Sequence, residues 1–216
     1  MFTSRRITTI GGDKFRDEFS VNFDGSDSYI KIPSTTFDVD GSTHSFAFWC
    51  KRHATNSWDV VLGIEPSASN NFIIFSNSTD TITIEGSEGD MAKGNIENVA
   101  GVWYHFVVVC DSGTVQVYQN GKAITMTDTS IASDITINCI GGSSSSLGFN
   151  GPITDVAIYN SALTASQVRT LYNDREPYNH KEGIASSNLT HWYRMGDGTL
   201  DATNADEGGV VSDDSQ

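Results

Sequence analysis

Cysteine is scarce in this sequence, and the number and spacing of the cysteines argue against a disulfide framework and against thiolate metal sites. Only Cys50, Cys110 and Cys139 occur among the 216 residues, and no two of them stand at metal-ligand spacing. An odd count without a disulfide framework indicates synthesis in a reducing compartment. Cys50 and Cys110 end apolar runs, so we predict that both are free thiols in the core. A chain of this length can bury a sizeable core without disulfides or structural metals.

Long apolar segments are also missing. No run approaches the roughly 18 residues of a membrane span. No apolar stretch follows Arg5 and Arg6, so no signal peptide is visible. We therefore expect no membrane insertion and no obvious export route.

Positive charge is in short supply. Thirteen Lys and Arg face 27 Asp and Glu, which gives a net charge of −14. Such a surface repels phosphate backbones and anionic lipids, and this argues against nucleic-acid and membrane partners. It is compatible with cations and with neutral partners such as glycans or proteins, although the charge can also serve solubility alone.

What the sequence does have is a series of short strand patterns separated by turns. Charged residues make up only 19%, and there are 20 glycines. Alternating or continuous apolar segments indicate strands. These segments are 19–24, 29–32, 46–50, 60–64, 72–75, 81–85, 103–110, 114–119, 135–137 and 153–159. Residues 86–98, which are rich in Gly, Asn and Glu, are predicted to be a loop.

One segment has the pattern of a helix. Thr164 and Gln167 form a capping box, and Val168 begins an i, i+3, i+4 apolar repeat, so we predict a helix over 164–173. After it, the apolar cluster 189–195 is a candidate strand that returns to the sandwich. Residues 1–18 are interpreted as an N-terminal arm, and residues 196–216 as an acidic tail.

Four segments carry a family resemblance. They are Phe23–Ile30, Phe46–Trp49, Trp103–Lys122 and Phe149–Thr164. In this order they resemble the laminin-G-like domains of the concanavalin A-like superfamily. The resemblance implies an all-β, two-sheet antiparallel jelly-roll sandwich over 19–175 with one short C-terminal helix, followed by an extension over 176–216. Family members include glycan binders, adhesion modules and hydrolases, so the fold leaves the function open.

Catalysis is not expected. Glycoside hydrolases of this fold carry carboxylates along one strand as Glu-x-Asp-x-(x)-Glu. The nearest pattern here runs from Glu85 through Glu88 to Asp90, in the wrong order and among glycines that indicate a turn. The histidines show no metal spacing, and no serine lies in a nucleophile elbow.

Calcium is the cofactor that the resemblance suggests, because the family often holds Ca²⁺ at the rim of the sandwich. The matching ligands would be Asp155 in the closing strand and Asp24 in the first turn. The alternative is that both aspartates bond to backbone groups of their own turns.

Glycan binding needs exposed aromatic rings beside polar groups. Trp58, with Asn56 and Asp59, is the predicted ligand-binding group, and Tyr178 with Asn179 and His180 is an alternative. Trp49 and Trp103 lie inside strand patterns and are predicted to belong to the core.

Three functions are compatible with these features. The first is a non-catalytic structural or binding protein of a phage virion, such as a capsid decoration, fibre or tail-associated protein. It would be made in the host cytoplasm and contact other virion proteins or itself as a homo-oligomer, with glycans as a further candidate partner. Residues 189–197 also resemble a segment that follows such domains in uncharacterised phage proteins. The second is a free lectin-like adhesion module, and the third is a glycoside hydrolase.

Overall fold

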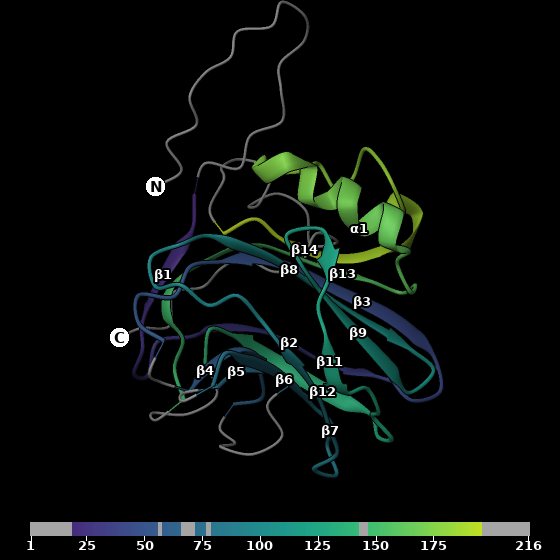
Figure 1. Ribbon diagram of the computed structural model, residues 1–216, viewed down its shortest axis with the longest axis horizontal. Helices are drawn as coiled ribbons and strands as arrows, with labels where there is room; N and C mark the ends of the chain where they lie inside the picture. The colour runs from purple at the N-terminus through teal and green to yellow at the C-terminus, as the bar shows by residue number, and fades with distance from the viewer. Residues whose placement is uncertain (1–18, 56–57, 66–71, 77–78, 143–146, 196–216) are drawn as a thin grey trace, which may run out of the picture.

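We describe a computed structural model of the chain at residues 19–55, 58–65, 72–76, 79–142 and 147–195. Two antiparallel seven-stranded sheets lie face to face, and in the described part of the chain one short α-helix lies over the outer face of one sheet (Figure 1). The predicted all-β jelly-roll sandwich with a short C-terminal helix is thereby confirmed.

Sheet A is the sheet that the helix covers. Its order is β1-β13-β3-β8-β9-β10, with β14 also paired to β13. The strands are β1 (Val21–Asp24), β3 (Thr43–Cys50), β8 (Tyr104–Asp111), β9 (Thr114–Gln119), β10 (Lys122–Ala123), β13 (Asn150–Tyr159) and β14 (Leu189–Tyr193). Strand β3 pairs with one edge of β13. On the other edge, β1 pairs with residues 150–153 and β14 pairs with residues 156–159.

Sheet B has the order β11-β7-β6-β5-β4-β12-β2. The strands are β2 (Ile30–Phe37), β4 (Asp59–Gly63), β5 (Ile73–Phe75), β6 (Thr81–Glu85), β7 (Met91–Asn95), β11 (Met126–Asp128) and β12 (Ile135–Ile140). The prediction that 86–98 is a loop is wrong, because β7 lies within it. Its inward positions are Ala92 and Gly94, and a Cβ at Gly94 would lie 2.6 Å from a methyl of Ile124. Small inward residues hide the alternation that identifies a strand.

Both faces of sheet A are buried. Phe46 and Phe48 point into the inner core between the sheets, whereas Ala47 joins an outer core beneath the helix. Val107 and Val109 of β8 belong to the same outer core. A strand that is covered on two faces needs apolar residues on both, which is why the sequence of β3 shows a continuous apolar run and not an alternation.

The predicted helix and turns are present. Helix α1 (Ala165–Tyr172) begins after Thr164, and both bonds of the capping box with Gln167 are made. The hairpin turns at Ser112-Gly113 and Asn120-Gly121 have positive φ at both residues, which Gly and Asn tolerate best. Two short 3₁₀ helices follow α1, η1 (Asn173–Arg175) and η2 (Ser186–Asn188).

The folded unit extends past the predicted boundary at residue 175. Strand β14 pairs with β13, and the side chains of Tyr193 and Met195 belong to the inner core. The described part of the sandwich therefore reaches Met195, and the strand predicted within 189–195 is present and pairs with it. The predicted arm (1–18) and tail (196–216) lie outside the described residues. Within the residues that are described, no helix has the length and apolarity to cross a membrane.

Candidate functional site

Asp155, a predicted calcium ligand, is buried beneath the C-terminal segment. It lies at a bulge in β13, with φ of 53°, where the partner of the strand changes from β1 to β14. Its carboxylate accepts hydrogen bonds from Trp192 Nε1 at 2.6 Å and from His180 Nε2 at 3.1 Å. The other ring nitrogen of His180 bonds to the hydroxyl of Tyr159. Asp155 thus fastens residues 176–195 to sheet A.

Charge stabilisation holds this carboxylate ionised. Burial by itself would raise the pKa of Asp155, but the electrostatic attraction of His180 and the hydrogen bonds from His180 and Trp192 outweigh burial and lower it. Nearby, burial lowers the pKa of His105 to about 3, against a small opposing attraction from Asp155. His105 is therefore neutral near pH 7, and its ring contacts both Trp49 and Tyr172, which also stack on each other.

Asp24 lies elsewhere. It is exposed, and its Oδ1 accepts from Ser26 N at 2.8 Å and from Ser28 Oγ at 2.9 Å, which closes its own turn. These bonds lower the pKa of Asp24. Asp24 pairs with Asn150, five residues before Asp155 on β13, so the structure does not bring the two predicted calcium ligands together. The alternative of local hydrogen bonding describes Asp24 well; Asp155 instead bonds to distant side chains.

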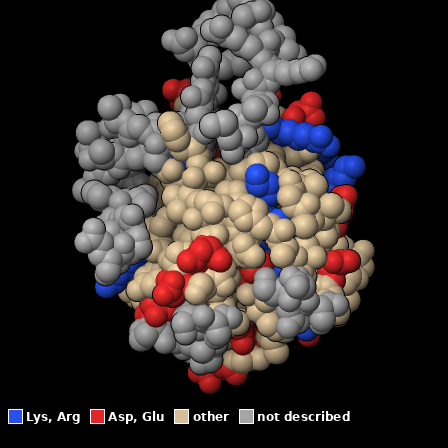
Figure 2. Space-filling view, turned by 90° about the vertical axis from the view of Figure 1, so that its left-hand side faces the viewer, with Lys and Arg blue, Asp and Glu red and all other residues tan. Residues whose placement is uncertain are grey.

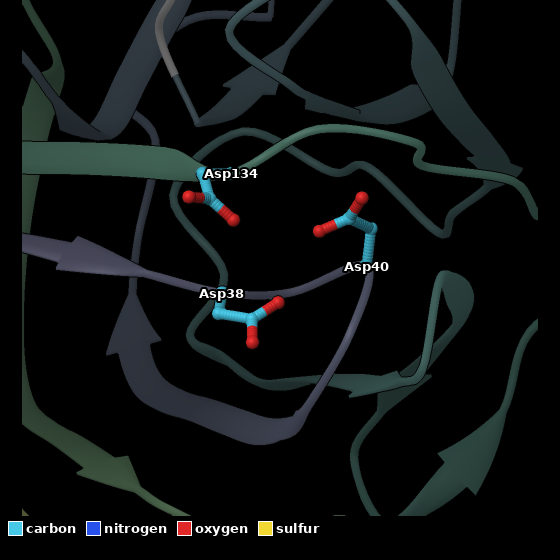
Figure 3. A group of neighbouring side chains, drawn as sticks. All are labelled: Asp38, Asp40 and Asp134. Carbon is cyan, nitrogen blue, oxygen red and sulfur yellow. The ribbon is translucent and has the colours of Figure 1, made fainter.

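Another group of carboxylates has the spacing of a cation site. Asp38 and Asp40 follow β2, Asp134 precedes β12, and their oxygens lie within 4.8 Å of one another (Figure 3). All three residues are exposed. Ca²⁺ takes six to eight oxygen ligands, so this group could supply about half of a coordination shell. It is the one such group among the residues that the structure describes, and Asp38 also accepts from Gly41 N at 2.7 Å.

The predicted ligand-binding group is only partly available. Trp58 is exposed, at 42% of its surface, directly before β4. Asp59 is fully buried and forms an ion pair with Arg52, so the prediction that it contacts a ligand is corrected. Asn56 lies outside the described residues.

Trp58 lies at one end of the sandwich, which we call the rim. The rim consists of the described residues of five loops, namely 25–29, 51–55 with 58, 76 with 79–80, 96–103, and 141–142 with 147–149. Figure 2 views the molecule from the side on which β1 and β4 lie in Figure 1, and uncharged residues form most of the visible surface, with acidic groups in its lower part. Four exposed apolar side chains belong to these loops: Tyr29, Trp58, Val99 and Val102.

A small pocket opens at the base of the rim. Apolar side chains form its floor, and Arg52, Asn98 and Tyr104 supply its polar edge. Arg52 was not singled out from the sequence. The available signal was an arginine two residues after the end of a strand and an aspartate seven residues later, at the start of the next strand. A lone charged pair of this kind also occurs on solvated loops, so only the tertiary structure identifies it.

The remaining aromatic candidates are mostly structural. Trp49 is buried, as predicted, whereas Trp103 is half-buried under the ammonium group of Lys51, 5.3 Å from its ring centroid. The alternative group at Tyr178 is closed, because His180 is buried in the Asp155 network.

The carboxylates considered for catalysis lie at a turn. Glu85 ends β6 and Glu88 is exposed in the β6–β7 turn, where Gly89 has φ of 83°. Asp90 bonds to Ser133 Oγ at 2.6 Å and to Ala132 N, an arrangement that ties this turn to the neighbouring segment. The turn predicted from the glycines is confirmed.

Solved structures with the same fold include binding proteins. A putative carbohydrate binding protein from Bacteroides ovatus ATCC 8483 superposes with a TM-score of 0.60 at 18% identity, covering 90% of this chain and 55% of that one. The Ruminococcus gnavus IT-sialidase CBM40 gives a TM-score of 0.54 at 12% identity, covering 71% and 96%. This chain thus spans about half the length of the Bacteroides protein. At these identities the likeness shows the fold alone. No curated protein matches the sequence.

The family is shown by the sequence itself. The family model Laminin_G_3, described as the concanavalin A-like lectin/glucanases superfamily, matches residues 24–169. This range covers the four segments that carried the resemblance and most of both sheets. The chain belongs to the concanavalin A-like lectin/glucanase superfamily.

Proposed function

We propose that the protein is a non-catalytic, lectin-like module that binds neutral glycans at the rim. The observation that carries the proposal is the exposed indole of Trp58, which stands on a loop end of a lectin-type sandwich. Sugar rings present apolar C–H faces, and an exposed indole offers a flat apolar partner for them. The net charge of −14 favours neutral sugars over acidic ones.

Binding to a glycan array, with and without Ca²⁺, tests the proposal. The comparison with Ca²⁺ is included because the Asp38, Asp40 and Asp134 carboxylates could hold a hard cation. We expect Trp58→Ala to lower the affinity for a neutral glycan at least tenfold. Met91→Ala is the matched control, because Met91 is similarly exposed (44%) but lies on β7, outside the rim. Equal loss in both variants, or no binding by the native chain, would refute glycan binding at the rim.

As a second candidate, we propose that the module belongs to the surface of a phage particle, where it contacts other virion proteins or copies of itself. The three cysteines are buried free thiols, and a fold without disulfides can be completed in a reducing host cytoplasm. The resemblance of residues 189–197 to phage sequences also supports this role. Mass spectrometry of purified particles tests it, and absence of the chain from them would exclude it.

A further inference from the structure

Arg52 has a buried charge at the base of the rim. Only 4% of the residue is exposed, and its guanidinium forms an ion pair with Asp59, which is fully buried. The two residues stand at the two ends of the segment that carries Trp58. The ion pair therefore closes this loop at its base.

The same side chain reaches two further loops. Nη1 of Arg52 donates to Asn98 Oδ1 at 3.2 Å, and Nη2 donates to the carbonyl of Ser76 at 3.5 Å. The carbonyl of Arg52 accepts from Gly101 N at 2.8 Å. A planar guanidinium spreads five donors over three nitrogens in a fixed fork, whereas the three donors of a lysine ammonium all belong to one nitrogen, so a lysine cannot reproduce this arrangement of acceptors.

The exposed apolar residues of the rim lie between these anchors. Val99, which is 52% exposed, directly follows Asn98, and Val102, which is 41% exposed, directly follows Gly101. Trp58 directly precedes Asp59. The buried guanidinium thus bonds to the side chains next to Trp58 and Val99, and the backbone carbonyl of Arg52 holds the residue next to Val102.

We propose that Arg52 is the positioning residue of the ligand-binding rim: it does not contact the ligand, and it sets the arrangement of Trp58, Val99 and Val102. Because the guanidinium is buried and engaged by Asp59, Asn98 and Ser76, it is not the arginine that would bind a carboxylated sugar. The inference rests on the proposed glycan binding and extends it to the way the site is built.

Three variants of the full chain test the proposal. Arg52→Met removes the cation, Arg52→Lys keeps the charge without the fork, and Arg52→Met with Asp59→Leu removes both buried charges, so that the fold does not carry an unpaired carboxylate. Each variant is measured for affinity to the neutral glycan found on the array. Amide hydrogen exchange in 96–103 and the fluorescence of Trp58, isolated by subtracting Trp58→Phe, report on the rim itself.

We expect Arg52→Met and the double variant to lower affinity at least tenfold, to speed exchange in 96–103, and to shift the emission of Trp58. Arg52→Lys should recover only part of each change. Asp155→Asn is the control: it weakens a buried carboxylate network outside the rim and should lower the melting temperature while leaving affinity and the rim signals unchanged.

Two results would overturn the inference. One is affinity and exchange within twofold of the native chain in the double variant. The other is that Asp155→Asn changes the affinity and the rim signals as much as the Arg52 variants do, which would show that Arg52 acts only through the overall stability of the fold. If the native chain binds no glycan, the proposed function fails. The positioning role is then judged by the rim signals alone, and it is overturned if Arg52→Met and the double variant leave the exchange in 96–103 and the emission of Trp58 unchanged.

Discussion

Aspartates occur in two contrasting regions of this molecule. Beneath the C-terminal segment, Asp155 is 2% exposed and is bonded by His180 and Trp192. At the loops around Asp38, Asp40 and Asp134, three carboxylates stand close together in solvent. The former region is stabilised by its charge, and the latter carries charges that repel one another.

The difference shows how burial changes the role of one residue type. A buried carboxylate is costly to desolvate and stays ionised only while its donors remain. An exposed carboxylate is hydrated and screened by salt, so its neighbours alter stability little. Replacing aspartates in the two regions should therefore give effects of very different size.

The largest effect is expected from Asp155→Ala. The change leaves the ring nitrogens of His180 and Trp192 without their acceptor, and it places alanine at a φ of 53°. We expect a loss of about 3–5 kcal/mol in the free energy of unfolding, measured by urea denaturation. Asp155→Asn should lose less, because asparagine tolerates this φ and keeps an acceptor oxygen. A loss below about 1 kcal/mol in Asp155→Ala would contradict a structural role for the network.

The next largest effect is a loss of folding stability at acidic pH. His105 has a pKa of about 3 in the folded state, against 6.5 for the ordinary group, so the unfolded chain binds a proton that the folded chain excludes. Stability is therefore full above pH 6.5 and falls as the pH drops toward 3, by about 1.4 kcal/mol per pH unit. The lowered pKa of Asp155 adds to this loss only below about 3.8.

His105→Phe separates this contribution from that of other groups. Phenylalanine keeps a ring in contact with Trp49 and Tyr172 but does not titrate. Unfolding measured from pH 7 to 4 should show a shallower loss in the variant. Parallel curves for variant and native chain would show that His105 is not the group responsible.

A smaller effect is expected from Trp192→Phe. The change removes the 2.6 Å bond to Asp155 but leaves His180 in place and keeps an aromatic ring in the outer core. We expect a loss of about 1–3 kcal/mol by thermal or urea unfolding. A larger loss than that of Asp155→Ala would place the main contribution in ring packing instead of in the carboxylate.

The smallest effect is expected from Asp40→Asn. Removing one of three neighbouring exposed charges should change stability by no more than about 0.5 kcal/mol, in the stabilising direction at low salt. The gain should vanish in 1 M NaCl, because screening weakens the repulsion. A loss of more than about 1 kcal/mol would show that the contrast between the two regions is wrong.

The sequence predicted most of the architecture, because strand and turn signals are local. The apolar runs of β3 and β8 predicted two strands, and Thr164 with Gln167 located the helix start. Strand β7 was not predicted, because its inward residues are small and hide the alternation of a strand. The candidate site was predicted less well. Trp58 is exposed as glycan binding requires, but Asp59, directly beside it, turned out to be an internal ion partner.

By itself, the sequence determined the sandwich, its turns, its capped helix and its acidic surface, since each depends on neighbouring residues or on composition. Only the tertiary structure decided which charges are buried. Asp155 meets His180 and Trp192, 25 and 37 residues away, and Arg52 meets Asn98 across 46 residues. Such pairings follow from how β13, β14 and the rim loops come together in space, and no local pattern along the chain encodes them.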